Sequence, residues 1–212
     1  MASHQNSDEI SKEVLASYIK AYNNYKDNDT DKTKEYNNKI IEYYKKNNDY
    51  NEMINYREDL INCLENDFEF DDAIIYCEEC IELSELINDI VLANSYRLRA
   101  ANHYARGAKY DIAAKHFEKL AIDNQTNEYN MNAILCYLKS NVMIAKEMLN
   151  TVRNKQPEFS VSNDYKFLSQ VIEAIINLNM DIFMKAVTTY DNIKKLEPWQ
   201  VTLLLHIKKI IM

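Results

Sequence analysis

Apolar residues recur along almost the whole chain at the three- and four-residue spacing of amphipathic helices. Ile54, Leu60, Ile61 and Leu64 form one such series. Short segments rich in Asn and Asp separate the apolar stretches. The pattern predicts helices, with boundary errors of about 2–4 residues, at residues 8–26, 31–46, 50–65, 70–86, 89–106, 110–121, 127–139, 141–154, 163–178, 180–193 and 197–211.

An internal repeat indicates how these helices pack. The segment FDDAIIYCE begins at Phe70 and recurs as YDIAAKHFE from Tyr110, forty residues later. The small Ala73 and Ala113 occupy matching positions, where they allow a neighbouring helix to approach closely. Short connections also force successive helices to lie antiparallel. We therefore predict an all-α fold, a right-handed stack of antiparallel helical hairpins that resembles tetratricopeptide repeats at a longer period.

The C-terminal part of the chain has a more continuous apolar pattern and follows a longer connection at residues 154–162. We predict a hairpin stack over residues 1–154 and a helical cap over residues 155–212. Trp199 lies in the first turn of the last predicted helix, directly after Pro198. Its ring is expected to fill the interior of the cap.

Composition supports the helical prediction and excludes several kinds of protein. One Gly and two Pro leave little material for β-turns or phosphate-binding loops. The net charge of −8 argues against a general nucleic-acid binder. The N-terminal segment has no apolar signal sequence, and no stretch reaches the ~18 apolar residues of a membrane span. Four scattered cysteines are typical of reduced thiols. We interpret the chain as soluble and intracellular.

The sequence contains two patterns that could carry chemistry, and neither predicts an enzyme. Cys77 and Cys80 have the spacing of a redox or zinc motif, but they lie within a predicted helix and no second ligand pair accompanies them. Core packing explains both. The carboxylates from Glu78 to Glu85 fit a solvated helix face. We therefore predict no catalytic residue, no metal site and no cofactor.

A polar stripe is the most informative feature of the helix predicted at residues 89–106. Ser95, Arg99, Asn102 and Arg106 follow one another at spacings of four, three and four residues, and Arg97 flanks them. One interpretation is an ordinary solvated face. The other is a docking surface for an acidic partner, because guanidinium groups pair well with carboxylates.

The sequence resembles the alpha-type soluble NSF attachment proteins. The resemblance is most specific in TTYDNIKKLEPWQVTLLLHIKKII, and it extends to QPEFSVSNDYKFL, VIEAIINLNMD and ANSYRLRAANHYARGAKYDIAAKHFEKLA. It implies a non-catalytic adaptor that grips the SNARE four-helix bundle and recruits the hexameric ATPase NSF to disassemble it. It also implies a cytoplasmic protein that reaches vesicle and Golgi membranes through its partners.

The resemblance also implies candidate binding residues. Among the family's basic SNARE-facing positions, Arg99 keeps its charge, whereas those aligned with Asp49, Asn55 and Ser95 are not basic. Other basic residues near these positions are expected to compensate, and the SNARE-binding candidates are therefore Arg99, Arg97, Arg57 and Arg106.

Among the family's acidic ATPase-facing positions, Glu173 is retained, while the carboxylate is lost at Asn141, Ile176 and Asn177. The comparison further implies that the chain begins partway into the family's pattern, without its first hairpins, and stops before its acidic tail. These departures keep a second function open, that of a divergent helical-repeat scaffold for another protein partner.

Overall fold

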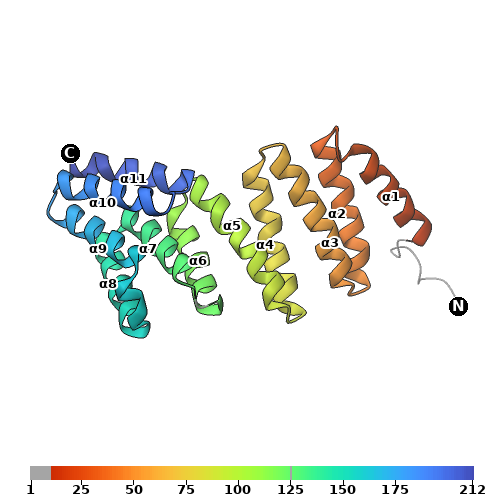
Figure 1. Cartoon of the computed structure of the whole chain (residues 1–212). Helices are drawn as coiled ribbons and strands as arrows, with labels where there is room; N and C mark the ends of the chain where they lie inside the picture. Colours follow the sequence, from red (N-terminus) through yellow and green to blue (C-terminus); the bar gives the residue numbers. More distant parts are fainter. Residues whose placement is uncertain (1–10, 125) are drawn as a thin grey trace, which may run out of the picture. The chain divides into compact units, whose positions relative to one another are not determined.

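The chain is built from helices, as a computed structural model that describes residues 11–124 and 126–212 shows (Figure 1). Within these two ranges there is no strand. The helices are α1 (Lys12–Tyr25), α2 (Thr30–Lys46), α3 (Tyr50–Asn66), α4 (Phe70–Leu86), α5 (Ile90–Arg106), α6 (Tyr110–Asn124), α7 (Asn127–Ser140), α8 (Val142–Lys155), the 3-10 helix η1 (Pro157–Val161), α9 (Asn163–Ile176), α10 (Met180–Ile193) and α11 (Pro198–Ile211).

The predicted helices are confirmed to within a few residues at each end. Residues 8–10 of the first predicted helix lie outside the described residues. The longer connection expected at residues 154–162 contains η1, whose Phe159 is fully buried. None of the described helices is both long and apolar enough to cross a membrane.

A twenty-residue period governs α2 to α6, which begin at residues 30, 50, 70, 90 and 110. The residue two positions before α3, α4, α5 and α6 has a positive φ in every case, and the four residues are Asn48, Phe68, Asn88 and Ala108. The next residue then donates its backbone N–H to a carbonyl in the last turn of the preceding helix, as Asp49 does to Tyr44 at 3.0 Å. One tight turn is thus repeated, and the forty-residue sequence repeat corresponds to two helices with their turns.

The first of two compact units comprises residues 1–96. Its helices pack in chain order, α1 on α2, α2 on α3 and α3 on α4 (Figure 1). A polar contact joins two helices that are two apart, because the Tyr22 hydroxyl in α1 donates to Asp59 in α3 at 3.0 Å. The Thr30 hydroxyl at the start of α2 donates at 2.9 Å to Asp67, directly after α3. Helices α2 and α3 are therefore each held by a neighbour on both sides, as expected for stacked hairpins.

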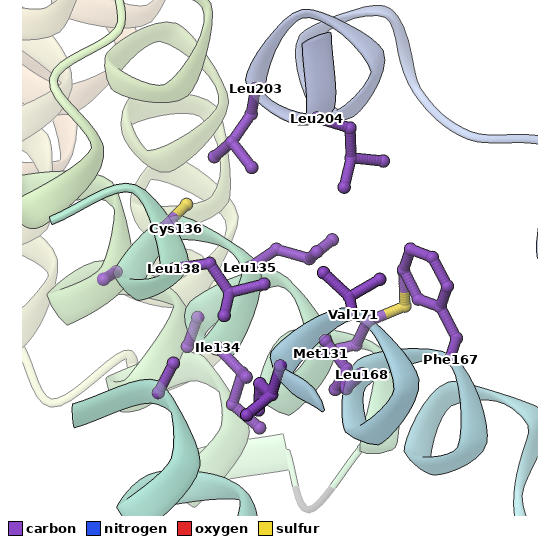
Figure 2. Packing of buried hydrophobic residues seen from close by; sticks show 14 of the residues in the cluster. Met131, Ile134, Leu135, Cys136, Leu138, Phe167, Leu168, Val171, Leu203 and Leu204 are labelled. Atoms are coloured by element: carbon purple, nitrogen blue, oxygen red, sulfur yellow. The ribbon is translucent and has the colours of Figure 1, made fainter. Parts of the chain in front are cut away.

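The second unit comprises residues 97–212 and contains a large apolar core. Helix α7 lies at its centre and packs against α6, α8, α9 and α11. Figure 2 shows side chains of α7, α9 and α11 meeting in this core, among them Leu135, Phe167 and Leu203. Because α7 is buried along most of its length, it organises the helices around it.

Trp199 is buried, with 4% of its surface exposed. Its ring stacks on that of Phe117 in α6, with 5.8 Å between the ring centroids. The expected burial is therefore confirmed, and the contact reaches beyond residues 155–212 to a helix of the predicted hairpin stack. A separate cap over residues 155–212 stays a prediction.

Candidate functional site

The polar stripe of α5 contains two arginines that solvent can reach. Arg106 is exposed and Arg99 is half-buried, as is Asn102 between them. These three residues belong to the second unit, and Ser95, which is exposed, belongs to the first. Helical spacing places the three residues of the second unit on one side of α5, as expected from the sequence.

Arg97 lies on the buried side of α5 and is only 5% exposed. Its Nη1 is 3.8 Å from Oδ2 of Asp123, a carboxylate that also lies 3.0 Å from the Lys119 ammonium. Arg97 thus holds α5 against α6, and the structure separates it from Arg99 and Arg106.

Arg57 is also buried, at 6% exposure, in the first unit. Its Nη1 donates to Asn37 and Asn38, each at 2.7 Å, and its Nε lies 2.7 Å from Oε2 of Glu79. The guanidinium also stacks over the Tyr76 ring at 4.6 Å. These contacts tie α2, α3 and α4 together. Glu79, expected on a solvated face, is half-buried and serves this network.

Glu173 is exposed near the C-terminal end of α9. Ile176 and Asn177, the aligned positions that lack a carboxylate, are exposed beside it. Asn141 instead caps α8, because its side-chain oxygen accepts from the backbone N–H groups of Met143 and Ile144. Glu173 therefore remains available to a partner.

The stripe of α5 continues into a groove that the sequence did not predict. The groove has a volume of about 240 Å³. Its walls come from α5, α7, α10, α11 and the α10–α11 connection, and its lining includes Asn102, Arg106, Glu128, Tyr129, Asn132, Lys194, Lys195, Glu197 and Gln200. These segments are up to about a hundred residues apart in the sequence, so no local pattern indicates that they meet.

A chain of hydrogen bonds forms the floor of this groove. The backbone N–H of Glu197 donates to Oε1 of Gln200 at 2.8 Å, and Nε2 of Gln200 donates to Oδ1 of Asn132 at 2.8 Å. Gln200 and Asn132 are 6% and 9% exposed. Because the Glu197 side chain in turn accepts from the Gln200 backbone, a capping box fixes this end of α11.

The rim of the groove carries three cations. Lys194 pairs with Glu128 at 3.2 Å, and Lys195 pairs with Asp191 at 2.7 Å. Both pairs are largely exposed, and such pairs contribute little to stability. Arg106, the third cation, is exposed to solvent. An incoming anion can therefore compete for these groups at low energetic cost.

Tyr190 is a further titratable residue that lines the groove, and its hydroxyl group is held by contacts with other helices. The Tyr190 hydroxyl donates to Asp164 at 2.6 Å and lies 3.0 Å from the Met131 sulfur. Burial, reinforced by the Asp164 carboxylate, raises the pKa of Tyr190 well above its usual value. Tyr190 therefore acts as a neutral hydrogen-bond donor at any physiological pH and serves as a fixed wall of the groove.

The cysteine pair in α4 is part of the core. Cys77 and Cys80 are both fully buried, which confirms the packing interpretation. Burial raises the pKa of the Cys80 thiol, so this group stays protonated. Among the residues that the structure describes, no group of three or more His, Cys, Asp or Glu side chains is arranged to hold a metal ion.

Stacked helical hairpins define a helical-repeat protein. The family model of the soluble NSF attachment proteins, SNAP, matches residues 1–212. The chain belongs to this family.

Relatives named for the same family have modest identity to the chain. It is 25% identical to an alpha-soluble NSF attachment protein of Dictyostelium discoideum over 81% of its length, covering 62% of that protein. It is 25% identical to a probable vesicular-fusion protein sec17 homolog of Schizosaccharomyces pombe over 92% of its length, covering 71% of that protein. The mouse alpha-soluble NSF attachment protein is 31% identical over 56% of the chain and 43% of its own length. The chain thus spans less than two thirds of the length of two of these three relatives.

Proposed function

We propose that this chain is an adaptor that binds assembled SNARE four-helix bundles and recruits a hexameric ATPase of the NSF type. It acts in the cytoplasm and reaches vesicle and Golgi membranes through these partners. The observation that carries the proposal is the match to the soluble NSF attachment protein family along the entire chain.

The distribution of charge supports a particular place for the SNARE contact. Residues 1–96 contain 22 acidic and 9 basic side chains, a net charge of −13, whereas residues 97–212 contain 11 acidic and 16 basic ones, a net charge of +5. An acidic helical bundle is attracted to the second unit and repelled by the first. Arg99 and Arg106, on the accessible side of α5, are the basic residues we assign to this contact.

Charge reversal tests the SNARE contact. The double variant Arg99→Glu, Arg106→Glu is expected to weaken binding to an assembled SNARE bundle by at least ~10-fold at low salt, since it replaces attraction by repulsion at partner-facing positions. Lys146→Glu, on the exposed surface of α8, is the matched control and should bind like the wild type. Equal binding by both variants would refute the assignment. Wild-type binding should itself fall as salt rises.

Glu173 tests the ATPase contact. Glu173→Lys is expected to reduce recruitment of the ATPase to the adaptor–bundle complex while leaving bundle binding unchanged, because it reverses the charge of one exposed carboxylate. Co-sedimentation of the ATPase with the complex measures this. A wild-type chain that recovers neither a SNARE bundle nor the ATPase would instead favour a divergent scaffold for another partner.

A further inference from the structure

We infer that the cavity between α6, α8 and η1 binds one lysine side chain of a partner protein, whose ammonium group is received by the Glu118 carboxylate. The cavity has a volume of about 760 Å³ and is lined by residues of α6, α7, α8 and η1 and by Gln156. The described lining residues of this cavity and of the groove beside α5 do not overlap. The site is therefore distinct from the contacts proposed above.

Glu118 of α6 is a half-buried carboxylate in the wall of the cavity. The Tyr137 hydroxyl of α7 donates a hydrogen bond to it. Burial raises the pKa of Glu118, and the Tyr137 hydrogen bond and the charge of Lys115 lower this pKa only in part. The carboxylate has thus lost hydration that these two residues do not fully replace. A cation bound beside Glu118 would stabilise its ionised form.

An amide in the same wall adds an acceptor. Asn130 of α7 lines the cavity and is only 7% exposed. Its Nδ2 donates to the Thr126 carbonyl oxygen and to Oε1 of Gln156, each at 3.4 Å. Because its nitrogen is engaged, Asn130 can meet a ligand with its oxygen, which accepts. Glu118 and Asn130 therefore favour a ligand that donates, and an ammonium group donates three hydrogen bonds.

Apolar side chains of the lining favour a cation with an aliphatic stem. Ile122 of α6, which is 72% exposed, and Met148 and Val152 of α8 are among them. A lysine can pack its four-carbon stem against such groups while its ammonium group reaches a carboxylate. An arginine fits less well, because its planar fork pairs best with a carboxylate whose two oxygens are both free. At Glu118, Tyr137 already takes part of that capacity.

The charge of the lining matches a single cation. Glu118 and Glu158 are its carboxylates and Lys155 is its ammonium group, so the lining carries a net charge of −2 + 1 = −1. Lys155 and Glu158 are both exposed. A lysine side chain brings one positive charge, whereas a polyamine brings several and is repelled more strongly by Lys155.

A small probe tests the site. N-acetyl-lysine amide, titrated into the whole chain, is expected to shift the side-chain amide resonances of Asn130 and the methyl resonances of Ile122. N-acetyl-norleucine amide, which has a similar stem without the charge, should not. N-acetyl-arginine amide and spermidine should bind more weakly than the lysine probe. The carboxyl resonance of Glu118, followed against pH, should show a lower pKa with the lysine probe than without it.

Three variants of the chain separate the contributions to binding. Glu118→Gln should weaken binding of the lysine probe about tenfold, because it removes the charge but keeps an acceptor for Tyr137. Lys155→Gln should strengthen binding, since it removes a repelling charge. Glu42→Gln makes the same chemical change as Glu118→Gln at an exposed position of the first unit, and it should bind like the wild type.

Equal responses to the lysine and norleucine probes, tighter binding of the arginine probe or spermidine, or undiminished binding by Glu118→Gln would overturn the inference. A pKa of Glu118 that the lysine probe leaves unchanged would do the same. Thermal unfolding distinguishes lost binding from a lost fold. Because glutamine avoids burying a charge, Glu118→Gln should melt no lower than the wild type. A lower melting temperature would give Glu118 a structural role and count against the site.

Discussion

Among the residues that the structure describes, five non-glycine residues adopt positive φ angles, between 50° and 62°, and all of them lie in turns between helices: Asn48, Phe68, Asn88, Ala108 and Leu178. Asn tolerates this conformation, while the other side chains pay a steric cost of about 1 kcal/mol or more. The single glycine, Gly107, does not relieve it, because it precedes Ala108 and has no positive φ. A shortage of glycine therefore indicates helices without excluding left-handed turn residues.

Replacing Ala108 by Gly should stabilise the protein. Ala108 is exposed and has a φ of 57°, so removing its Cβ relieves strain that outweighs the added freedom of the unfolded chain. We expect a gain of about 0.5–1 kcal/mol in the free energy of unfolding, measured by urea denaturation. Ala16→Gly, at an exposed position inside α1, is the control and should lose about 1 kcal/mol. A loss at both positions would show that Ala108 is not strained.

Trp199 offers a second test at the scale of a single residue. Trp199→Ala should destabilise the second unit by about 3–5 kcal/mol, through lost burial and the cavity left beside Phe117. Thermal unfolding followed by circular dichroism measures the effect, since the variant lacks the chain's one tryptophan fluorophore. Trp199→Phe keeps an aromatic ring there and should lose less. A melting temperature unchanged by Trp199→Ala would contradict the stacked, buried ring.

Single elements were largely predictable from the sequence, because apolar spacing alone places the helices. The same spacing also contained an overlooked signal for two arginines. Arg57 follows Ile54 by three residues and precedes Ile61 by four, so it lies on the buried face of α3. Arg97 lies four residues after the buried Ala93 and four before the buried Ala101 in α5. Their charge suggested a surface position, whereas their spacing indicated burial.

The contacts of Arg57 should contribute strongly to the stability of the packing between α2, α3 and α4. Arg57→Leu is expected to lower the stability of the first unit by about 3 kcal/mol, since Asn37 and Glu79 lose their charged partner. Hydrogen exchange in α2–α4 should accelerate, and exchange in α9–α11 should change less. Lys45→Gln removes an exposed charge from α2 and should cost no more than about 0.5 kcal/mol. Equal effects of the two changes would refute a structural role for Arg57.

The groove could not be predicted at the level of elements. Arg106, Asn132, Lys194 and Gln200 reach it from four places in the sequence, and each alone has an ordinary explanation on its own helix or connection. The lysines look like a solvated pair, and Gln200 looks like a capping-box residue. Only the packing of the second unit brings these residues to one groove. The sequence therefore indicated the polar stripe of α5 but not the groove into which the stripe leads.

At the scale of the whole molecule, the division of charge is the dominant feature. The first unit carries a net charge of −13 and the second +5. Like charges within one unit repel one another and destabilise its compact state, and salt screens that repulsion. The two units should therefore differ in how their stability depends on ionic strength.

Raising sodium chloride from about 0.05 M to 0.5 M should slow amide exchange in α2–α4 more than in α9–α11. Chloride is preferred to sulfate, because sulfate strengthens apolar burial everywhere. Hydrogen exchange followed by mass spectrometry resolves the two units in one sample. Faster exchange in the first unit would mean that its ion pairs, such as those of Lys34 with Glu69 and Asp72, outweigh the net repulsion.

The twenty-residue period of the first unit has a mechanical consequence. Since α1 to α4 pack in chain order, a force applied to the N-terminal end acts on the folded hairpin nearest that end. Removing two helices with their turns frees forty residues, or about 140 Å of extended chain. In an optical trap the first unit would then lengthen in even steps of that size, and each step would leave the remaining hairpins in register.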